Sequence, residues 1–125
     1  MTRVLYIGQD PATVDFSDPA LPPGMSTDRI QAGIDLSLGQ MRERGWQAEF
    51  CPVQSDDSAG PAVERALAGG GVDCVVIGGG LRLPPRSLPL FERVLNAVHR
   101  AAPQAAIAFN TTPQDTADAV ARWRG

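Results

Sequence analysis

The chain contains no lysine, because all 11 of its basic residues are arginine. This absence excludes Schiff-base chemistry, a lysine general base and the phosphate-binding lysine of a P-loop. His99 is the only histidine. Zinc sites built on two or more histidines are therefore excluded, and two distant cysteines cannot replace them. A Ser-His-Asp or Cys-His catalytic arrangement would have to use His99, which we instead expect late in a helix as a cation that suits the dipole.

Positive charge, cysteine and long apolar runs are also scarce. The net charge is −3 and the arginines form no cluster, which argues against nucleic acid as a partner. No apolar run approaches the ~20 residues that span a membrane, and the chain opens on a strand pattern, so we expect neither a membrane segment nor a signal peptide. Cys51 and Cys74 lie in apolar segments. We expect two buried, reduced thiols in a cytoplasmic protein.

The length of 125 residues predicts one domain spanning residues 1–125, with a single core. Four strand-like runs alternate with four helix-like runs, which is typical of parallel strands joined by right-handed helical crossovers. The simplest arrangement is an α/β fold with a four-stranded parallel sheet of order 2-1-3-4 and helices on both faces. The expected strands are Arg3–Ile7, Gln47–Val53, Val72–Ile77 and Ala105–Phe109.

The helices are predicted from apolar residues that recur every three or four positions. Their expected inward stripes are Ile30, Ile34, Leu38 and Met41, then Val63 and Leu67, then Phe91, Val94, Leu95 and Val98, and finally Ala117, Val120 and Ala121 within Pro113–Arg124. Ser26 or Thr27, Ser87 and Thr112 are the expected N-caps, and Gly45 is the expected left-handed end of the first helix.

The two strands expected at the sheet edges differ. Gln47–Val53 carries Glu49 and Pro52, both of which blunt an edge against pairing with another chain. Nothing of this kind protects Ala105–Phe109. We therefore expect a homodimer that uses the fourth strand or its adjacent helices.

The strand Val72–Ile77 runs directly into Gly78-Gly79-Gly80 and Arg82, and we place the candidate site there. Ligands of open parallel sheets bind at the carboxyl ends of the strands, where the strand order reverses. Successive glycine N–H groups can form an anion nest, and Arg82 could hold a carboxylate or phosphate with two hydrogen bonds. The expected ligand-binding residues are Asp10, Gly78, Gly79, Gly80, Arg82, Asn110 and Thr111. In the alternative, the glycines only allow a tight strand exit, Arg82 is solvated and Asn110 satisfies backbone groups.

The segment Gly8–Met25 is the only one long enough to be a lid or a disordered tract. Its residues Asp10, Asp15 and Asp18 could converge on a divalent cation, but carboxylates before proline or in turns more often cap the backbone or stay solvated. We therefore expect no metal.

These features resemble a response-regulator receiver or, more broadly, a flavodoxin-like, Rossmann-like domain. The resemblance rests on the strand–helix alternation, on Asp10 directly after the first strand and on the strand Val72–Ile77, and it implies a three-layer sandwich. A receiver has its phospho-acceptor aspartate where this chain has Gly78, and it needs a second acid beside Asp10 and a lysine. The chain therefore departs from the receiver pattern, and no phosphotransfer is implied. A flavodoxin holds its flavin phosphate on a hydroxyl-rich turn, which Gly8–Pro11 is not, so we expect no cofactor.

Other segments, Asp10–Pro23, Gly78–Pro85 and Phe91–His99, are similar to small bacterial proteins with no assigned function, a likeness that transfers no site. A composition rich in Ala, Arg, Gly and Pro without Lys also indicates a bacterial source.

Three functional hypotheses follow from the sequence. The first is a non-catalytic or regulatory domain that binds a small anionic ligand or a partner protein at the carboxyl edge of the sheet. The second is a small enzyme that uses Asp10 as acid or base, with Arg82 and Asn110 as polar stabilisers. The third is a purely structural interaction protein.

Overall fold

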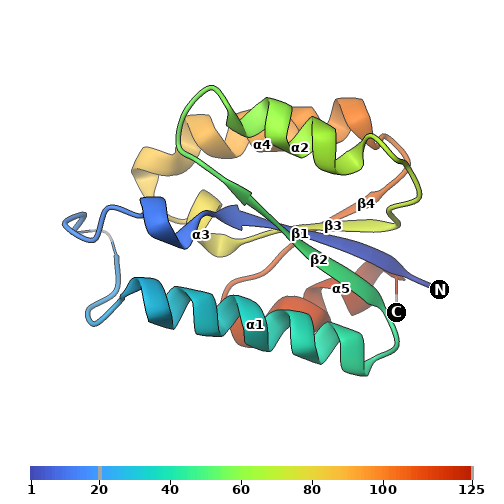
Figure 1. The fold of residues 1–125 in the computed structure, drawn as a ribbon, viewed down its shortest axis with the longest axis horizontal. Coiled ribbons are helices and arrows are strands. Elements are labelled where there is room, and N and C mark those ends of the chain that lie inside the picture. The colour runs from blue at the N-terminus through green and yellow to red at the C-terminus, as the bar shows by residue number, and fades with distance from the viewer. Residues whose placement is uncertain (20, 125) are drawn as a thin grey trace.

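Four parallel strands form one sheet in the computed structural model, which describes residues 1–19 and 21–124. The strand order β2-β1-β3-β4 confirms the predicted topology. Figure 1 shows α2 and α4 over one face of the sheet and α1 and α5 over the other, so the fold has three layers. The strands are β1 (Arg3–Gln9), β2 (Gln47–Val53), β3 (Cys74–Ile77) and β4 (Ala106–Phe109).

The helices alternate with the strands as predicted. They are α1 (Thr27–Glu43), α2 (Ala59–Leu67), α3 (Gly79–Arg82), α4 (Leu88–Ala101) and α5 (Thr116–Arg124). Short 3-10 turns, η1 (Pro11–Thr13), η2 (Pro85–Ser87) and η3 (Pro113–Asp115), precede α1, α4 and α5. Both ends of α1 follow the predicted chemistry. Ser26 Oγ accepts the Arg29 N–H at 3.2 Å, and Gly45 takes a positive φ of 85°.

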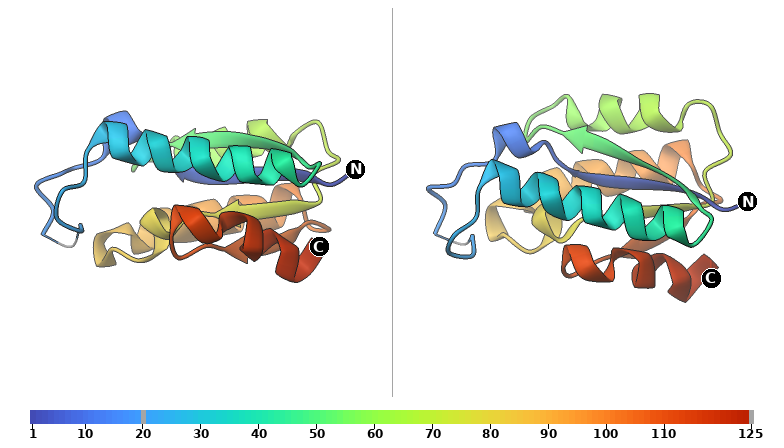
Figure 2. Two further views of the ribbon diagram at one scale, coloured as in Figure 1. Left: turned by 90° about the horizontal axis from the view of Figure 1, so that it is seen from below. Right: turned by 60° about the horizontal axis from the view of Figure 1, so that its bottom comes forward.

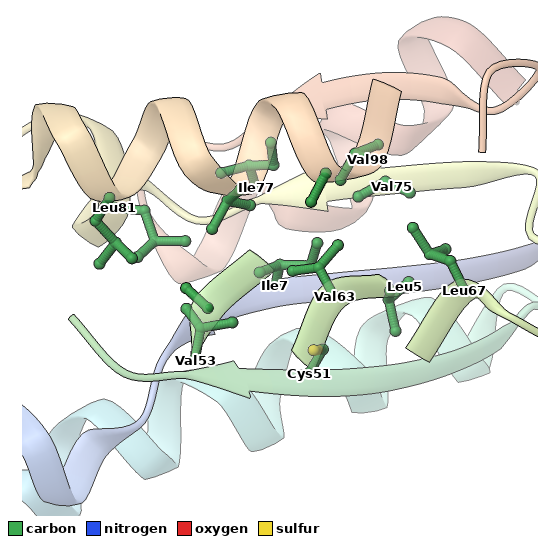
Figure 3. Packing of buried hydrophobic residues seen from close by; sticks show 14 residues of the cluster. Leu5, Ile7, Cys51, Val53, Val63, Leu67, Val75, Ile77, Leu81 and Val98 are labelled. Atoms are coloured by element: carbon green, nitrogen blue, oxygen red, sulfur yellow. The ribbon is translucent and has the colours of Figure 1, made fainter. Parts of the chain in front are cut away.

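The sheet is buried on both faces, as its uninterrupted apolar strands predict. Leu5, Ile7, Val75 and Ile77 point towards α2 and α4, where they pack with Val63 and Leu67 (Figure 3). Val4, Tyr6, Cys74 and Val76 point the other way and pack with residues of α1 and α5. Successive strand residues therefore belong to different halves of the core.

β3 is shorter than predicted, because it begins at Cys74 rather than Val72. Asp73, just before it, accepts the Arg3 N–H at 2.8 Å and pairs with Arg124 at 3.2 Å. These contacts tie the amino end of β3 to β1 and to the end of α5.

The inward stripe of α4 is also rotated from the predicted one. Val94 and Val98 are buried as expected, but Phe91 and Leu95 are only half-buried. Leu90 and Ala97 are buried in their place. The reason is the position of α4 at the end of the sheet. Its outer side extends past β4, where no further strand lies beneath it within the described part of the chain.

Candidate functional site

The carboxyl ends of the strands share one edge of the sheet, and the loop after β1 projects beyond that edge (Figure 1). The structure brings together the predicted residues that follow β3 and β4. Gly79 N–H donates to Asn110 Oδ1 at 2.7 Å, and Arg82 Nη2 donates to Asn110 O at 2.9 Å. The Asp10 N–H instead donates to Val53 O at the end of β2, at 2.8 Å.

The glycine run is helical rather than an open loop. Gly78 is extended and the four-residue helix α3 begins at Gly79, which the sequence did not predict. The predicted helix after Ser87 is α4, which begins at Leu88. The Gly78 N–H donates to Ile7 O at 2.9 Å and the Leu81 N–H to Gly78 O at 3.0 Å. Together with the bond from Gly79 to Asn110, these contacts direct the N–H groups of Gly78, Gly79 and Leu81 into the protein instead of towards one external anion.

Close packing explains why two of these positions are glycine. A Cβ on Gly78 would lie 3.3 Å from both Ile7 O and Tyr6 Cε1. A Cβ on Gly79 would lie 3.2 Å from Leu83 Cδ1 and 3.3 Å from Thr111 O. The exits of β3 and β4 are therefore in direct contact, and protein atoms fill the space between them.

Asn110 is the residue that joins these exits, and only 2% of it is exposed. Its Oδ1 accepts from α3, while its Nδ2 donates to Thr116 Oγ1 at 2.8 Å and to Tyr6 Oη at 3.3 Å. Both amide protons and the amide oxygen are thus used inside the protein. The structure supports the alternative role, in which Asn110 satisfies backbone and side-chain groups.

The hydrogen-bond network continues from Asn110 into α1. Thr116 Oγ1 lies 3.0 Å from Ser37 Oγ, and both hydroxyls bond to Pro113 O. Ser37 and Thr116 are fully buried. Burial raises the pKa of Tyr6, although the hydrogen bond from Asn110 acts to lower it.

Sequence reasoning missed this network. The one sign of the network in the sequence is Ser37, a polar residue beside the apolar stripe of the first predicted helix.

Arg82 is half-buried against the last residues of β4. Its guanidinium carbon lies 5.6 Å from the centroid of the Phe109 ring, a cation–π distance. Arg82 Nε is buried and has no acceptor among the residues that the structure describes. A buried donor without a partner is rare in folded proteins and calls for an explanation.

The other two predicted site residues act locally. The Asp10 carboxylate accepts the Ala12 N–H at 3.0 Å and caps η1. Thr111 donates its N–H, at 3.0 Å, and its hydroxyl to Asp115. Burial acts to raise the pKa of Asp115, but hydrogen bonds from Thr111 and Thr112, with Arg122 nearby, lower it overall. Both carboxylates serve as caps.

The possible cation site in the loop after β1 does not form. Across residues 1–19 and 21–124, no three His, Cys, Asp or Glu side chains are grouped to hold a metal ion. Asp15 instead accepts the Ser17 N–H at 2.9 Å. Hydrogen bonds from Ser17 lower the pKa of Asp15, and the positive charge of Arg86 lowers it more weakly.

The loop after β1 and the segment from α3 to the start of α4 lie at the same edge of the sheet (Figure 1). Three large apolar side chains are exposed on these segments: Phe16 at 41%, Leu83 at 57% and Leu88 at 55%. We call Phe16, Leu83, Leu88 and Arg86 the rim. Sequence reasoning did not single out these residues, because periodicity does not say which apolar residues of a loop stay uncovered.

Two surface hollows lie elsewhere on the molecule. One, of ≈ 590 Å³, lies between α2 and α4 and is lined by charged residues that include Asp57, Arg93 and Arg100. The other, of ≈ 440 Å³, is lined by Arg3, Trp46 and neighbouring residues near the amino ends of β1 and β2. None of the predicted site residues lines either hollow.

No protein-family model matches the chain, and searches of curated proteins and of solved structures gave no significant match. Among residues 1–19 and 21–124, no helix has the length and apolar character needed to cross a membrane.

Proposed function

We propose that this chain is a binding or regulatory domain that recognises a partner protein through the rim, in the cytoplasm of a bacterium. One observation carries the proposal: Phe16, Leu83 and Leu88 are exposed at 41–57% on segments that both lie at the carboxyl edge of the sheet. Single exposed apolar residues are ordinary, but a group of them at one edge marks an interaction surface. The free, buried thiols Cys51 and Cys74 agree with a reducing compartment.

The polar groups at this edge favour a protein over a small anion. The N–H groups of Gly78 and Gly79 are bonded within the protein, and Asn110 is buried. The exposed side chains there include the apolar residues Phe16, Leu83 and Leu88, with Arg86 and Asp15 on the same segments. An apolar centre with charged groups around it is the usual composition of a protein–protein interface.

The test compares captured partners between two variants. Phe16, Leu83 and Leu88 are each replaced by serine in one variant, and Leu36, which is 42% exposed on α1, is replaced by serine in the control. Immobilised proteins are incubated with lysate of the source organism, and bound proteins are quantified by mass spectrometry. We expect a partner that the wild type and Leu36→Ser retain and the rim variant loses. Equal capture by all three proteins would refute the proposal.

A small anionic ligand at Arg82 is the second candidate, because Arg82 Nε is buried without an acceptor. An oxygen from phosphate or a carboxylate would satisfy it if the side chain moved off Phe109. Thermal shift with inorganic phosphate, acetate and nucleotides tests this candidate. A stabilisation that Arg82→Ala abolishes and Arg86→Ala preserves supports it, and the absence of any stabilisation rejects it.

The enzyme hypothesis gains no support from Asn110. Its two amide protons are donated to Thr116 and Tyr6, so it has no proton to offer a substrate beside Asp10.

A further inference from the structure

The two outer strands of the sheet, β2 and β4, differ in how their free edges are protected. On β2 the edge is blunted twice. Arg42 donates from Nε and Nη2 to the outward carbonyl of Ala48, at 3.2 and 2.8 Å, and Pro52 has no N–H to offer. Proline and charged side chains are the usual protection against pairing with another strand.

The edge of β4 is more open. The Ala106 N–H donates to Asp73 O at 3.0 Å, towards β3. Because backbone groups alternate in direction along a strand, the N–H and C=O of Ile107 and Phe109 point away from the sheet. Arg122 Nη2 bonds to the outward carbonyl of Phe109 at 3.1 Å, so this edge also carries one arginine contact, but that carbonyl keeps a second lone pair. No proline or charged residue interrupts Ala106–Phe109.

This edge is complementary to itself. A two-fold axis through Ala108, perpendicular to the sheet, would place Ile107 of one chain opposite Phe109 of the other, with both N–H···O bonds formed. A β-branched residue opposite an aromatic one is a favourable cross-strand pair. Ala108 would face its own counterpart in the pair without hydrogen bonds, where the strands approach most closely and a small side chain fits.

The helices beside β4 extend the same surface. Figure 2 shows α4 and α5 on either side of β4 at this end of the molecule. On α4, Phe91 packs edge-on against Phe109 with ring centroids 5.8 Å apart, and Leu95 beside it is also half-buried. A stable dimer buries about 1,200–2,000 Å² in total, which two four-residue strands cannot supply alone, so both helices must contribute.

The orientation of α5 agrees with a second copy of the chain at this edge. Asp118 lies in the first turn of α5, whereas Arg122 and Arg124 lie in its last turn. All three residues are exposed, although Asp118 pairs with Arg44 and Arg124 with Asp73 in the same chain. The same axis makes the two α5 helices antiparallel. The helix dipoles of the two α5 helices then run in opposite directions, which is favourable.

We propose that β4 pairs antiparallel with β4 of a second copy about a two-fold axis at Ala108, which joins the two sheets into one of twice the width. The dimer surface is centred on Ala108 and adjoins the rim at Leu88, which lies one turn before Phe91 on α4. The dimer does not depend on the proposed partner protein. The closed two-fold arrangement uses up both free β4 edges and leaves only the blunted β2 edges exposed.

Sedimentation equilibrium of the full chain, from micromolar to millimolar concentration, is the first test. We expect a dimer mass for the wild type and for Leu36→Lys on α1. We expect Ile107→Lys to weaken association by more than about tenfold, because a charged side chain on an edge opposes pairing. Circular dichroism checks that each variant is folded. A wild type that stays monomeric over this whole concentration range would overturn the proposal, even if the β4 edge pairs with a strand of another protein.

Ala108→Cys is the second test, and it does not depend on Ile107→Lys folding correctly. Cysteines facing each other across the axis should form an intermolecular disulfide under mild oxidation. The wild type is the control for Cys51 and Cys74, which are buried. A disulfide mapped to position 108 by mass spectrometry supports the proposed register. A wild-type dimer in which Ala108→Cys gives no such disulfide would place the interface elsewhere and overturn the proposal.

Discussion

Replacing Asn110 by alanine is the most direct test of the polar network at the carboxyl edge. The side chain is 2% exposed and makes hydrogen bonds to Gly79, Thr116 and Tyr6, which come from three different elements. Alanine removes all three bonds at once. If the residue serves mainly as a clamp, its loss should lower stability. If it were kept for a ligand, its loss should be nearly neutral or stabilising, because functional positions are often not optimal for stability.

The magnitude follows from the groups left behind. The Gly79 N–H would be buried without its acceptor, which costs about 1–3 kcal/mol. Losing the two bonds from Nδ2 costs about 0.5–1.5 kcal/mol each, although Thr116 keeps its contacts with Ser37 and Pro113. Allowing for relaxation, we expect a loss of about 2–4 kcal/mol in the free energy of unfolding, out of a typical total of about 5–15 kcal/mol.

Urea denaturation at neutral pH, followed by far-UV circular dichroism, measures this loss. Asn96→Ala is the matched control, because Asn96 is exposed and, among the described residues, its side chain donates only to Glu92 O within its own helix, at 2.9 Å. Its replacement should change stability by no more than about 0.5 kcal/mol. A loss below about 1 kcal/mol for Asn110→Ala, or any stabilisation, would refute the clamp.

Two further predictions concern packing and thiol chemistry. A Cβ on Gly33 would lie 2.8 Å from Pro113 Cγ, whereas one on Gly39 would meet nothing within 4 Å. In thermal or urea unfolding, Gly33→Ala should therefore destabilise the protein by about 1–3 kcal/mol, and Gly39→Ala, in the same helix, should stabilise it by about 0.5–1 kcal/mol. Burial raises the pKa of Cys74 to about 11 and also raises that of Cys51. Neither thiol should react with an aromatic disulfide reagent at mildly alkaline pH until denaturant is added, and rapid labelling of the folded protein would contradict this burial.

Sequence patterns predicted the architecture because burial is periodic. β2 has the predicted bounds, Gln47–Val53, since its alternation and flanking residues are strong local signals. Ser26 caps α1 as expected because an N-cap depends only on residues within one turn. Signals that act over a few residues can be read from one sequence.

The short helix α3 could not be predicted in this way. Glycine disfavours helix, so Gly78-Gly79-Gly80 was expected to be a loop. The helical turn is held by the bond from Gly79 to Asn110, 31 residues away, and by the burial of Leu81. Tertiary contacts of this kind override local propensity, and no spacing in the sequence marks them.

The polar network was missed for the same reason. The bond from Asn110 to Tyr6 spans 104 residues, and the contact of Ser37 with Thr116 spans 79. Sequence analysis expected the residues after β1, β3 and β4 to share one edge, because parallel strands end at one edge, and the residues after β3 and β4 are in contact there. It could not show that the polar groups there would satisfy one another.

At the carboxyl edge, a polar side chain is buried and large apolar side chains are exposed, which is the opposite of the usual arrangement. The polar residue expected to face a ligand, Asn110, is inside, and the apolar residues Phe16 and Leu83 are outside. Recognition at this edge should therefore depend on apolar contact, while association of two copies should depend on β4. The two proposals are separable, because serine at Phe16 and Leu83 should leave the sedimenting mass unchanged and Ile107→Lys should leave partner capture intact. A single variant that abolished both while remaining folded would mean that one surface serves both purposes.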